Sequence, residues 1–434
     1  MSENNINLES EFRQRWKQYQ HRFGIVVDAD LNSPKPDLGM IVVIPCYDEP
    51  DLLNTLESLY YCERPACSVE ILLIINASDA DDEAVHRQNR QTYEEVKAWA
   101  ERLFNDWFSV YVYMDNNISE KLCGVGYARK IGLDLAVSRF AQRDREQGIC
   151  LSLDADCLVE KNYLTTVYEH FIAYAEYPLA VINFAHRIEE VEQGQHKAAI
   201  IAYETHLRYY VQGIRYAGLP YAFHTLGSCF AVTAFGYMQQ GGMNKRQGGE
   251  DFYFIHKFSA LNLCSRIIST SVLPSARISQ RVPFGTGPTL SRWQNENKTD
   301  FVSYHPQVFR DLLSLSKAVN RIESKSQIAM FIQAGLPLSL VEYLKQLNIQ
   351  ARLNEFDKHT ASIDAFKQRF WQWFNAFIVM KYIHFAHEHY YQRIPLSDAI
   401  NELFYQQKIS NEDETDLSNA LRFLRLRDAE NGVI

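Results

Sequence analysis

The chain has 434 residues, of which 47% are hydrophobic and 22% charged, and its formal net charge is −9. This composition excludes a disordered chain, and the acidic balance disfavours general electrostatic binding to nucleic acid, so we expect no nucleic-acid partner. The length is too great for one ordinary core and predicts two domains, or one large domain with an appendage.

The cysteines and the N-terminus bear on the compartment. Cys62 and Cys67 stand too far apart for a CxxC pair and no second pair accompanies them, which predicts buried reduced thiols rather than structural zinc or disulfides. The first residues, MSENNINLESEFRQRW, contain no apolar segment, and no apolar run in the chain reaches about 18 residues. We therefore expect a cytoplasmic protein that is neither secreted nor membrane-spanning.

Strands and helices are predicted to alternate along the first part of the chain. Residues 1–37 form a polar, amphipathic helical extension that closes at the breaker cluster NSPKPDLG. The continuous apolar run Met40–Pro45 indicates a strand buried on both faces, and DLLNTLESLYY follows with helical spacing. Val69–Ile75 and Phe108–Met114 are two further strands, GYARKIGLDLAVSRFA is an amphipathic helix, and GICLSLDAD ends the fourth strand. This alternation predicts a mostly parallel α/β sheet flanked by helices.

Polar residues gather where these strands end. In parallel sheets, ligands bind at the carboxyl ends of the strands. The repeated placement of polar groups at this edge favours a binding site over a set of solvated turns, although aspartate is common in turns. The residues concerned are Asp48 and Glu49, Asn76 and Asp79, and Asp154 and Asp156.

Two acidic motifs suggest the chemistry of this site. Asp154 and Asp156 supply the hard oxygen ligands that suit Mg²⁺ or Mn²⁺, and such an ion would bridge a diphosphate and neutralise charge on a leaving phosphate. In GGMNKRQGGEDFYFIHKF, the residues Glu250 and Asp251 begin an apolar helix. Acidic residues favour the first turn of any helix, so this position is typical of a helix start as well as of a catalytic carboxylate beside a glycine-flanked loop.

Two other segments carry charge or imidazole groups. Arg277, Arg281 and Arg292 surround the turn FGTG, an arrangement that suits phosphate recognition but is also typical of surface arginines. From about residue 300, helical periodicity dominates. In HFAHEHYY, His389 points about 140° away from His384 on a helix, so a three-histidine metal site is disfavoured against aromatic packing. The aromatic run Phe366–Tyr391 leaves interfacial membrane binding open.

The order of these motifs resembles that of family 2 glycosyltransferases. VVIPCYDEPDLLNTLESL is similar to the family's VIIPxYNExxxLxxxLxSL, with Asp48 in place of Asn. In EILLIINAS, Asn76 stands where the family has a base-contacting aspartate, and in GVGYARKIGLDLA, Arg129 matches the family's arginine. DADC and GGMNKRQGGEDFYF stand where the family has its Asp-x-Asp and acceptor-side base motifs. The resemblance covers residues 38–300. TLSRW has Thr289 where processive synthases have Gln, so a processive synthase is disfavoured.

The resemblance implies a GT-A fold over 38–300, with the extension 1–37 before it and a helical C-terminal domain over 301–434. Asp251 is expected to be the general base, and Glu250, on a different side of the helix, is expected to hydrogen-bond the acceptor or the loop. Asp154 and Asp156 are expected to hold Mg²⁺ or Mn²⁺. The residues expected to contact the donor are Pro45, Tyr47, Glu49, Asn76, Arg129, Asp154 and Arg281.

The implied reaction moves a sugar from a UDP- or GDP-sugar to a hydroxyl of a glycan, a lipid-linked acceptor or another acceptor, with inversion at the anomeric carbon. The protein would then act in the cytoplasm, with peripheral association at the inner face of the membrane left open. Three alternatives stay open: a retaining transferase, a sugar nucleotidyltransferase and a non-catalytic nucleotide-sugar-binding protein. PCYDEPD lacks the glycine-rich phosphate loop that a nucleotidyltransferase usually has after its first strand.

Overall fold

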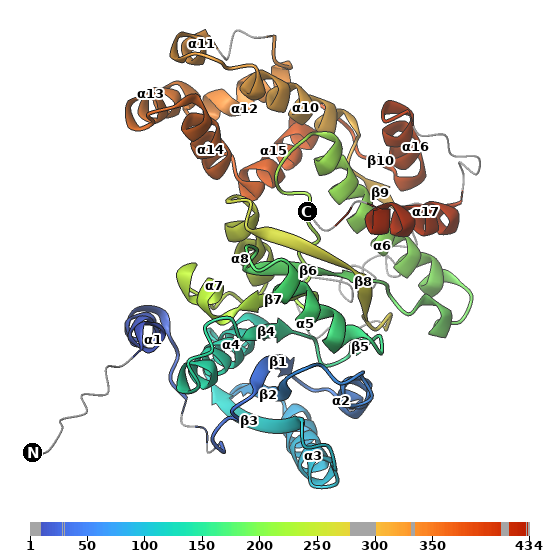
Figure 1. Cartoon of the computed structure of the whole chain (residues 1–434). Helices are drawn as coiled ribbons and strands as arrows, with labels where there is room; N and C mark the ends of the chain where they lie inside the picture. The colour runs from blue at the N-terminus through green and yellow to red at the C-terminus, as the bar shows by residue number, and fades with distance from the viewer. Residues whose placement is uncertain are drawn as a thin grey trace, which may run out of the picture.

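A twisted sheet with helices on both faces is the centre of the molecule (Figure 1). The computed structural model describes residues 10–27, 29, 31–277, 301–330, 335–408, 416–430 and 432. Within these residues eight strands form the sheet in the order β3-β2-β1-β4-β7-β6-β8-β5. Their bounds are β1 Leu38–Cys46, β2 Ser68–Ser78, β3 Phe108–Ile118, β4 Ile149–Ser152, β5 Leu158–Val159, β6 Leu179–Phe184, β7 Phe230–Thr233 and β8 Cys264–Leu273.

Most neighbouring strands of the sheet run parallel. β1 pairs in parallel with both β2 and β4, and β2 pairs in parallel with β3. β7 is antiparallel to β4 and to β6, so β6 points the same way as β4. The carboxyl ends of β1, β2, β4 and β6 therefore meet at one edge. The predicted α/β architecture, a mostly parallel sheet flanked by helices, is confirmed.

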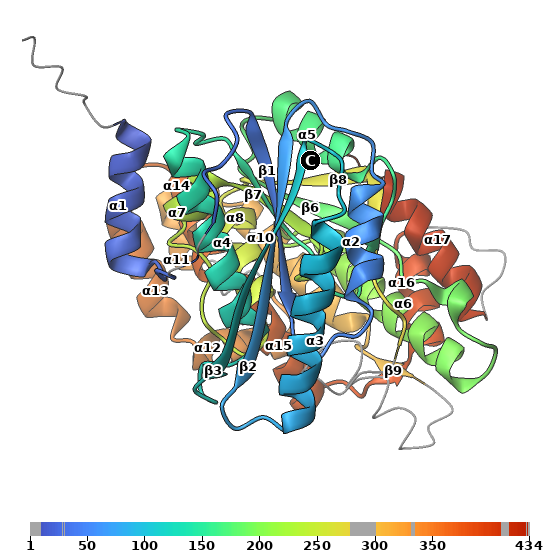
Figure 2. The same cartoon turned by 90° about the horizontal axis from the view of Figure 1, so that it is seen from below.

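The helices cover the two faces of the sheet because β1 alternates its side chains between two cores. Met40, Val42 and Ile44 pack with α2, α3 and α5, whereas Ile41 and Val43 pack with α1, α4, α7 and α8. Figure 2 shows α2 and α3 on the opposite side of the strands from α4. The bounds of these helices are α1 Glu11–Phe23, α2 Leu52–Tyr60, α3 Glu83–Ala100, α4 Val125–Gln142, α5 Tyr163–Ala173, α7 Ala234–Gln239 and α8 Glu250–Ser259.

Within the described residues of the N-terminal extension, the helix spans less of the chain than the sequence predicts. Of residues 10–27, 29 and 31–37, the helical ones are those of α1, which buries Phe12, Trp16 and Tyr19. The helix ends at Gly24 because the next amide, that of Ile25, donates to Asp134 Oδ2 of α4 at 2.6 Å. Tyr19 also donates to Asp134 Oδ1 at 2.8 Å, so α1 is fixed on α4.

Helices dominate the C-terminal part of the chain, as predicted. Their core is shared with α6, because Tyr209 and Ile214 of that helix pack among Phe309, Leu312 and Tyr382. A short antiparallel pair joins β9 to β10. The bounds of the remaining elements are η1 Ile188–Glu190, α6 Gln195–Tyr216, β9 Val302–Ser303, α10 Gln307–Asn320, α11 Lys325–Met330, α12 Leu338–Gln346, α13 Ile349–His359, α14 Ile363–Trp373, α15 Ala376–His389, β10 Ile394–Pro395, α16 Leu396–Gln406 and α17 Leu417–Glu430.

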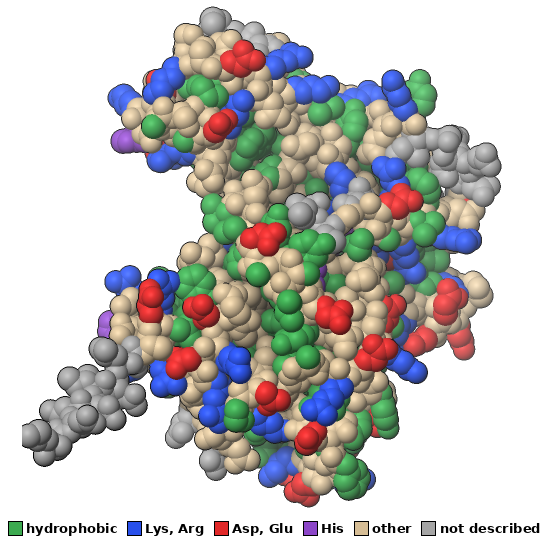
Figure 3. Space-filling view, viewed as in Figure 1, with side chains coloured by type: hydrophobic (Ala, Val, Ile, Leu, Met, Phe, Trp, Pro, Cys, Tyr) green, Lys and Arg blue, Asp and Glu red, His purple; other side chains and the backbone are tan. Residues whose placement is uncertain are grey.

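The surface is hollowed between α13 and α14 on one side and α1 and α7 on the other (Figure 3).

Within the described part of the chain, no helix is both long and apolar enough to cross a bilayer. All eight cysteines lie in the described residues as free thiols, and seven of them are buried whereas Cys123 is half-buried.

A buried ionic network attaches the last helix to α6. Asp428 of α17 accepts from Arg208 Nη1 at 2.6 Å and from His224 Nε2 at 3.0 Å. Glu204, also on α6, accepts from Arg425 Nη2 of α17 at 2.7 Å. Burial opposes ionisation of Asp428, but His224 and the neighbouring arginines hold its pKa well below the ordinary value. Charge pairing therefore joins helices that are distant in the sequence.

Asp428→Asn should destabilise the protein, because Arg208 would keep a buried positive charge without its carboxylate partner. Removing one partner of a buried pair typically costs about 3–5 kcal/mol. Urea unfolding followed by circular dichroism measures the change. Glu430→Gln, an exposed position on the same helix, is the matched control and should change stability by less than about 0.5 kcal/mol. Equal unfolding midpoints for the two variants would contradict the assigned role of this network.

Candidate functional site

The turn after β4 presents two aspartates to solvent and one alanine to the core. The amide of Leu153 continues the sheet by donating to Val43 O at 3.1 Å. Ala155 is buried, and its carbonyl accepts from Thr55 Oγ1 at 2.8 Å. The flanking side chains of Asp154 and Asp156 are 36% and 32% exposed. The alternation therefore directs both carboxylates outward at the carboxyl end of the strand.

Arg129 joins this turn to the acidic motif at the start of α8. Its guanidinium, on α4, contacts Asp154 Oδ1 through Nη2 and Glu250 Oε1 through Nη1. The side chain of Arg129 is only 5% exposed and that of Glu250 1%. Burial disfavours the charged guanidinium, but the carboxylates of Asp154 and Glu250 outweigh it and raise the pKa of Arg129. One buried cation thus holds two loops together.

Two glycines leave the space that this contact needs. A Cβ at Gly227 would lie 2.3 Å from Cζ and from Nη2 of Arg129, so the loop before β7 rests directly on the guanidinium. A Cβ at Gly126 would lie 2.1 Å from Arg246 O and 3.1 Å from Glu250 Cγ. The acidic loop therefore packs against the first turn of α4 at backbone distance.

Asp251 is the second carboxylate of the acidic motif. The helix α8 begins after Gly249, whose φ of 71° lies in the left-handed region that favours glycine. Burial and the neighbouring Glu250 raise the pKa of Asp251 to about 6, while Arg129 acts in the opposite direction. A carboxyl group with this pKa exchanges its proton near neutral pH, which is a property of general bases.

A second arginine, Arg277, contacts the carboxylates of Glu49 and Asp156 at the same edge of the sheet. Arg277 donates from Nη1 to Glu49 Oε1 at 2.9 Å and contacts Glu49 Oε2 through Nη2. The same Nη2 lies 3.5 Å from Asp156 Oδ2. Arg187, which follows β6, donates from Nη2 to the carbonyl of Asp156 at 3.1 Å. Two cations therefore lie beside the second aspartate of the turn.

The ends of β1 and β2 form the remaining side of the edge. Tyr47 donates to Asp81 Oδ1 at 3.1 Å, and the Ser78 amide donates to Asp81 Oδ2 at 2.7 Å. Burial of Tyr47, with the carboxylate of Asp81, raises the pKa of its phenol above the ordinary value. Asn76 is buried and directs its amide to Gly124 O at 3.5 Å.

Most of the predicted site residues thus lie at one edge of the sheet. Arg129, Asp154, Glu250 and Asp251 form one cluster around a buried guanidinium. Glu49 and Asp156 share Arg277, and Pro45 is buried as the last residue but one of β1. Glu250 is turned inward onto Arg129 rather than toward solvent. Arg281 lies outside the described residues, as do Thr289 and Arg292.

Sequence reasoning did not single out Arg187 or Asp81. Polar residues at the carboxyl ends of parallel strands indicate a binding site, and this rule also applies to Arg187. Arg187 follows the carboxyl end of β6, a strand that runs in the same direction as β4. Asp81 is three residues beyond β2 and is drawn back by the Ser78 amide, a turn that spacing alone does not predict.

The donor atoms at the turn fit a divalent cation that arrives with a phosphate ligand. Among the described residues, no three His, Cys, Asp or Glu side chains are grouped to hold a metal by themselves. Mg²⁺ typically uses one or two protein carboxylates and completes its shell with phosphate oxygens and water. Asp154 and Asp156 provide two such carboxylates, and both are accessible to solvent.

The C-terminal histidines lie against aromatic rings, since His384 and His387 contact Tyr304 and His389 contacts Phe385. His387 donates from Nδ1 to Ile383 O at 2.7 Å and accepts at Nε2 from the His305 amide at 2.9 Å. His256 in α8 is buried against Ser259, and burial lowers its pKa to about 3. Within the described part of the chain, neither His387 nor His256 forms a hydrogen bond with a carboxylate at the edge of the sheet.

No protein-family model and no curated protein matches this chain. Similar solved structures include S. aureus TarS 1-349 in complex with UDP-GlcNAc, with a TM-score of 0.40 and 14% identity, over 76% of this chain and 89% of that one. The mannosyltransferase PcManGT from Pyrobaculum calidifontis in complex with GDP-Man and Mn²⁺ gives a TM-score of 0.34 and 14% identity, over 96% of this chain and 94% of that one. At these TM-scores and identities, the two structures give no evidence about the activity of this chain.

Asp251 should titrate with a midpoint near pH 6, because burial and Glu250 raise its pKa. Carboxyl ¹³C NMR of the protein labelled at aspartate, with the resonance assigned by its loss in Asp251→Asn, measures this midpoint. Glu250→Gln should lower the midpoint, since the like charge disappears and Arg129 loses a competing partner. A wild-type midpoint near 4 would contradict the assigned environment.

The same shift has a consequence for stability. A carboxyl group whose pKa is raised by folding favours the folded state while it is protonated, and this contribution is lost as the pH rises through about 6. Asp251→Asn should therefore become more stable relative to wild type between pH 5 and pH 8. Thermal unfolding over this range measures the difference, and a difference that does not vary with pH would contradict the expectation.

Proposed function

We propose that this protein is a glycosyltransferase that moves a sugar from a nucleoside-diphosphate donor to an acceptor hydroxyl. The observation that carries the proposal is the bridge formed by Arg129. It joins a solvent-facing Asp-x-Asp turn to an acidic helix start that carries a carboxyl group with a raised pKa. The first motif has the ligands for a metal-bound diphosphate, and the second has a base for a hydroxyl.

The donor would lie along the carboxyl edge of the sheet. Asp156, with Asp154, would hold Mg²⁺ or Mn²⁺, and such an ion when bound neutralises the negative charge of the diphosphate. Tyr47 follows the last residue of β1 and Asn76 lies near the end of β2, and both would contact the nucleoside. Arg129 orients Asp154, and Arg277 lies close enough to the turn to contact phosphate oxygens once its pairing with Glu49 is exchanged.

Asp251 would remove the proton from the acceptor hydroxyl as it attacks the anomeric carbon opposite the departing diphosphate. This in-line attack inverts the anomeric configuration. Glu250 is buried against Arg129, so we assign it a positioning role: it fixes the guanidinium that in turn orients Asp154. This interpretation differs from the expected contact of Glu250 with the acceptor.

Asp156→Ala should lose both metal-dependent donor binding and turnover, whereas Asp251→Asn should keep donor binding and lose turnover by about 10²–10⁴-fold. Calorimetric titration of UDP or GDP in the presence of Mn²⁺ measures binding, and release of nucleoside diphosphate from a screen of nucleotide sugars measures turnover. Glu430→Gln, far along the chain on an exposed helix surface, is the matched acidic control and should change neither quantity.

Other outcomes would redirect the proposal. Equal metal-dependent binding by wild type and Asp156→Ala would contradict the metal assignment. Pyrophosphate as the released product would indicate a nucleotidyltransferase. Near-normal turnover of Asp251→Asn, or a product that keeps the donor's anomeric configuration, would indicate a retaining mechanism. Binding without turnover of any donor, with acceptors present, would indicate a non-catalytic protein.

Gly227→Ala should impair turnover without unfolding the protein, because the new methyl group would collide with the guanidinium of Arg129. Displacement of a positioning group by about 1 Å can cost about 10²-fold in rate. Ser228→Ala, the next residue in the same loop, adds no atom and should keep most of the activity. Turnover and thermal unfolding measured together separate a local effect from a loss of fold, and full activity of Gly227→Ala would contradict the role of Arg129.

A further inference from the structure

Two aromatic rings from different parts of the chain meet beside the acidic helix start. Tyr253 lies on α8, two residues after Asp251, and Phe377 lies in the first turn of α15. Their ring centroids are 5.4 Å apart, and Phe377 is 37% exposed. The hollow of Figure 3 ends where α8 approaches α14 and α15, as Figure 1 shows in the same view. The sheet and the C-terminal helices therefore share one aromatic surface, the Tyr253–Phe377 platform.

Each ring of the platform has a cation at its surface. Arg246 Cζ lies 4.2 Å from the centroid of the Tyr253 ring, and Lys381 Nζ lies 4.4 Å from that of Phe377. Both cations are exposed, and within the described residues neither forms an ion pair or a side-chain hydrogen bond. An aromatic ring attracts a cation electrostatically but supplies no oxygen acceptor for its N–H groups, so these donors remain available to another molecule.

The segments that carry these cations contain no acidic residue to neutralise them. Residues 241–249 include Lys245 and Arg246 and no Asp or Glu, and α15 has no acidic residue before Glu388. Of the two carboxyl groups that follow the loop, that of Glu250 is turned inward onto Arg129. The charge at the platform is therefore positive although the whole chain carries −9, and a negatively charged ligand complements it.

Aromatic rings together with cations suit one chemical class of ligand. The C–H groups on one face of a sugar ring are apolar and pack against aromatic rings, while the hydroxyl groups at its edge stay in water. Guanidinium and ammonium groups bind phosphate and carboxylate oxygens. A saccharide that carries an anionic group uses both features of the platform.

The position of the platform relative to Asp251 sets a minimum length for this ligand. Side chains two positions apart on a helix point to different sides of it. A helix with its side chains is about 10–12 Å across, which exceeds the size of one sugar ring. A ligand that rests on Tyr253 and also places a hydroxyl at Asp251 must therefore contain more than one sugar unit.

We propose that the Tyr253–Phe377 platform, with Arg246 and Lys381, holds the acceptor, and that the acceptor is an oligosaccharide that carries a phosphate or carboxylate group. This assignment rests on the proposed function, because it takes Asp251 as the base that meets the acceptor hydroxyl. The helical C-terminal part then contributes Phe377 and Lys381 to acceptor binding, whereas the donor lies along the carboxyl edge of the sheet.

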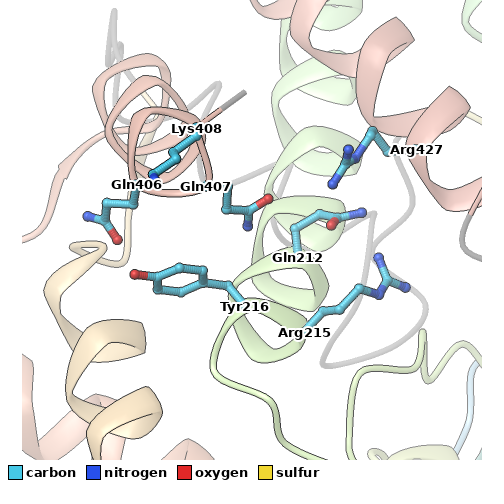
Figure 4. Close-up of a pocket in the computed structure, with 7 residues that line it drawn as sticks. All are labelled: Gln212, Arg215, Tyr216, Gln406, Gln407, Lys408 and Arg427. Carbon is cyan, nitrogen blue, oxygen red and sulfur yellow. The ribbon is translucent and has the colours of Figure 1, made fainter. Parts of the chain in front are cut away.

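Calorimetric titration of the full chain with two anionic oligosaccharides, mannopentaose phosphate and tetragalacturonate, tests the proposal. Arg246→Gln and Lys381→Gln should each weaken binding of the anionic probe by about threefold, because each removes one charge contact at an exposed site. Phe377→Leu, which removes the ring but keeps an apolar side chain, should weaken it as well. Lys408→Gln, at an exposed lysine that lines a separate pocket after α16 (Figure 4), is the matched control and should bind as wild type does.

The two probes also distinguish the anionic group. Binding of mannopentaose phosphate alone assigns a phosphate, and binding of tetragalacturonate alone assigns a carboxylate. The proposal would be overturned if neither probe bound, if neutral mannopentaose bound as tightly as its phosphate, or if Arg246→Gln, Lys381→Gln and Phe377→Leu all bound the probe as wild type does. Sedimentation with phosphatidylglycerol vesicles that is lost in Phe377→Leu, without binding of either probe, would overturn it in favour of a membrane surface.

Donor binding separates a failure of this proposal from a failure of the proposed function. Arg246→Gln and Lys381→Gln should keep the metal-dependent binding of UDP or GDP, since neither residue contacts the Asp-x-Asp turn among the described residues. Turnover with an acceptor KM unchanged in both variants would overturn the acceptor assignment and leave the transferase function standing. Platform-dependent probe binding without turnover of any donor would support the saccharide site and contradict the transferase function.

Discussion

The buried guanidinium of Arg129 is the contact on which the arrangement of the site depends. A buried charge is costly unless it is paired and hydrogen-bonded, so its position is fixed by carboxylates from two separate parts of the chain. Asp154 comes from the turn after β4 and Glu250 from the start of α8. Removal of either carboxylate would leave the cation without part of its compensation. Gly227 lets the loop before β7 approach the guanidinium, and Gly126 lets the loop that carries Glu250 approach α4.

The position of Arg129 depends in turn on how α4 is held. One residue along this helix, Lys130 donates to Asp134 at 2.7 Å and to Tyr19 of α1 at 2.6 Å. Burial lowers the pKa of Lys130, and Asp134 acts in the opposite direction. The N-terminal helix therefore completes a polar cluster on the side of α4 that faces away from the sheet. In this way α1, which lies outside the sheet, supports the residue that organises the site.

The C-terminal helices reach the same edge by another series of contacts. Glu204 of α6 accepts from the amide of His186 at 3.0 Å and from Arg425 of α17 at 2.7 Å. His186 directly precedes Arg187, whose guanidinium donates to the carbonyl of Asp156. The last helix of the chain is thus connected to the Asp-x-Asp turn by consecutive hydrogen bonds and ion pairs. Together with Arg277, these contacts offset the repulsion between carboxylates that the edge brings close together.

The sequence by itself determined the strand–helix alternation, the buried parallel strands and the polar residues at their carboxyl ends, because these depend on local periodicity. Asp154 and Asp156 were singled out in this way, and Glu250 and Asp251 by the glycine-flanked loop that begins an apolar helix. Only the tertiary structure decided that Glu250 turns inward to Arg129, that Arg187 contacts Asp156 and that α6 shares its core with the C-terminal helices. These features join residues up to hundreds of positions apart, and side-chain direction at a helix start depends on the charges that pack against it. Periodicity along one chain contains no information about such partners.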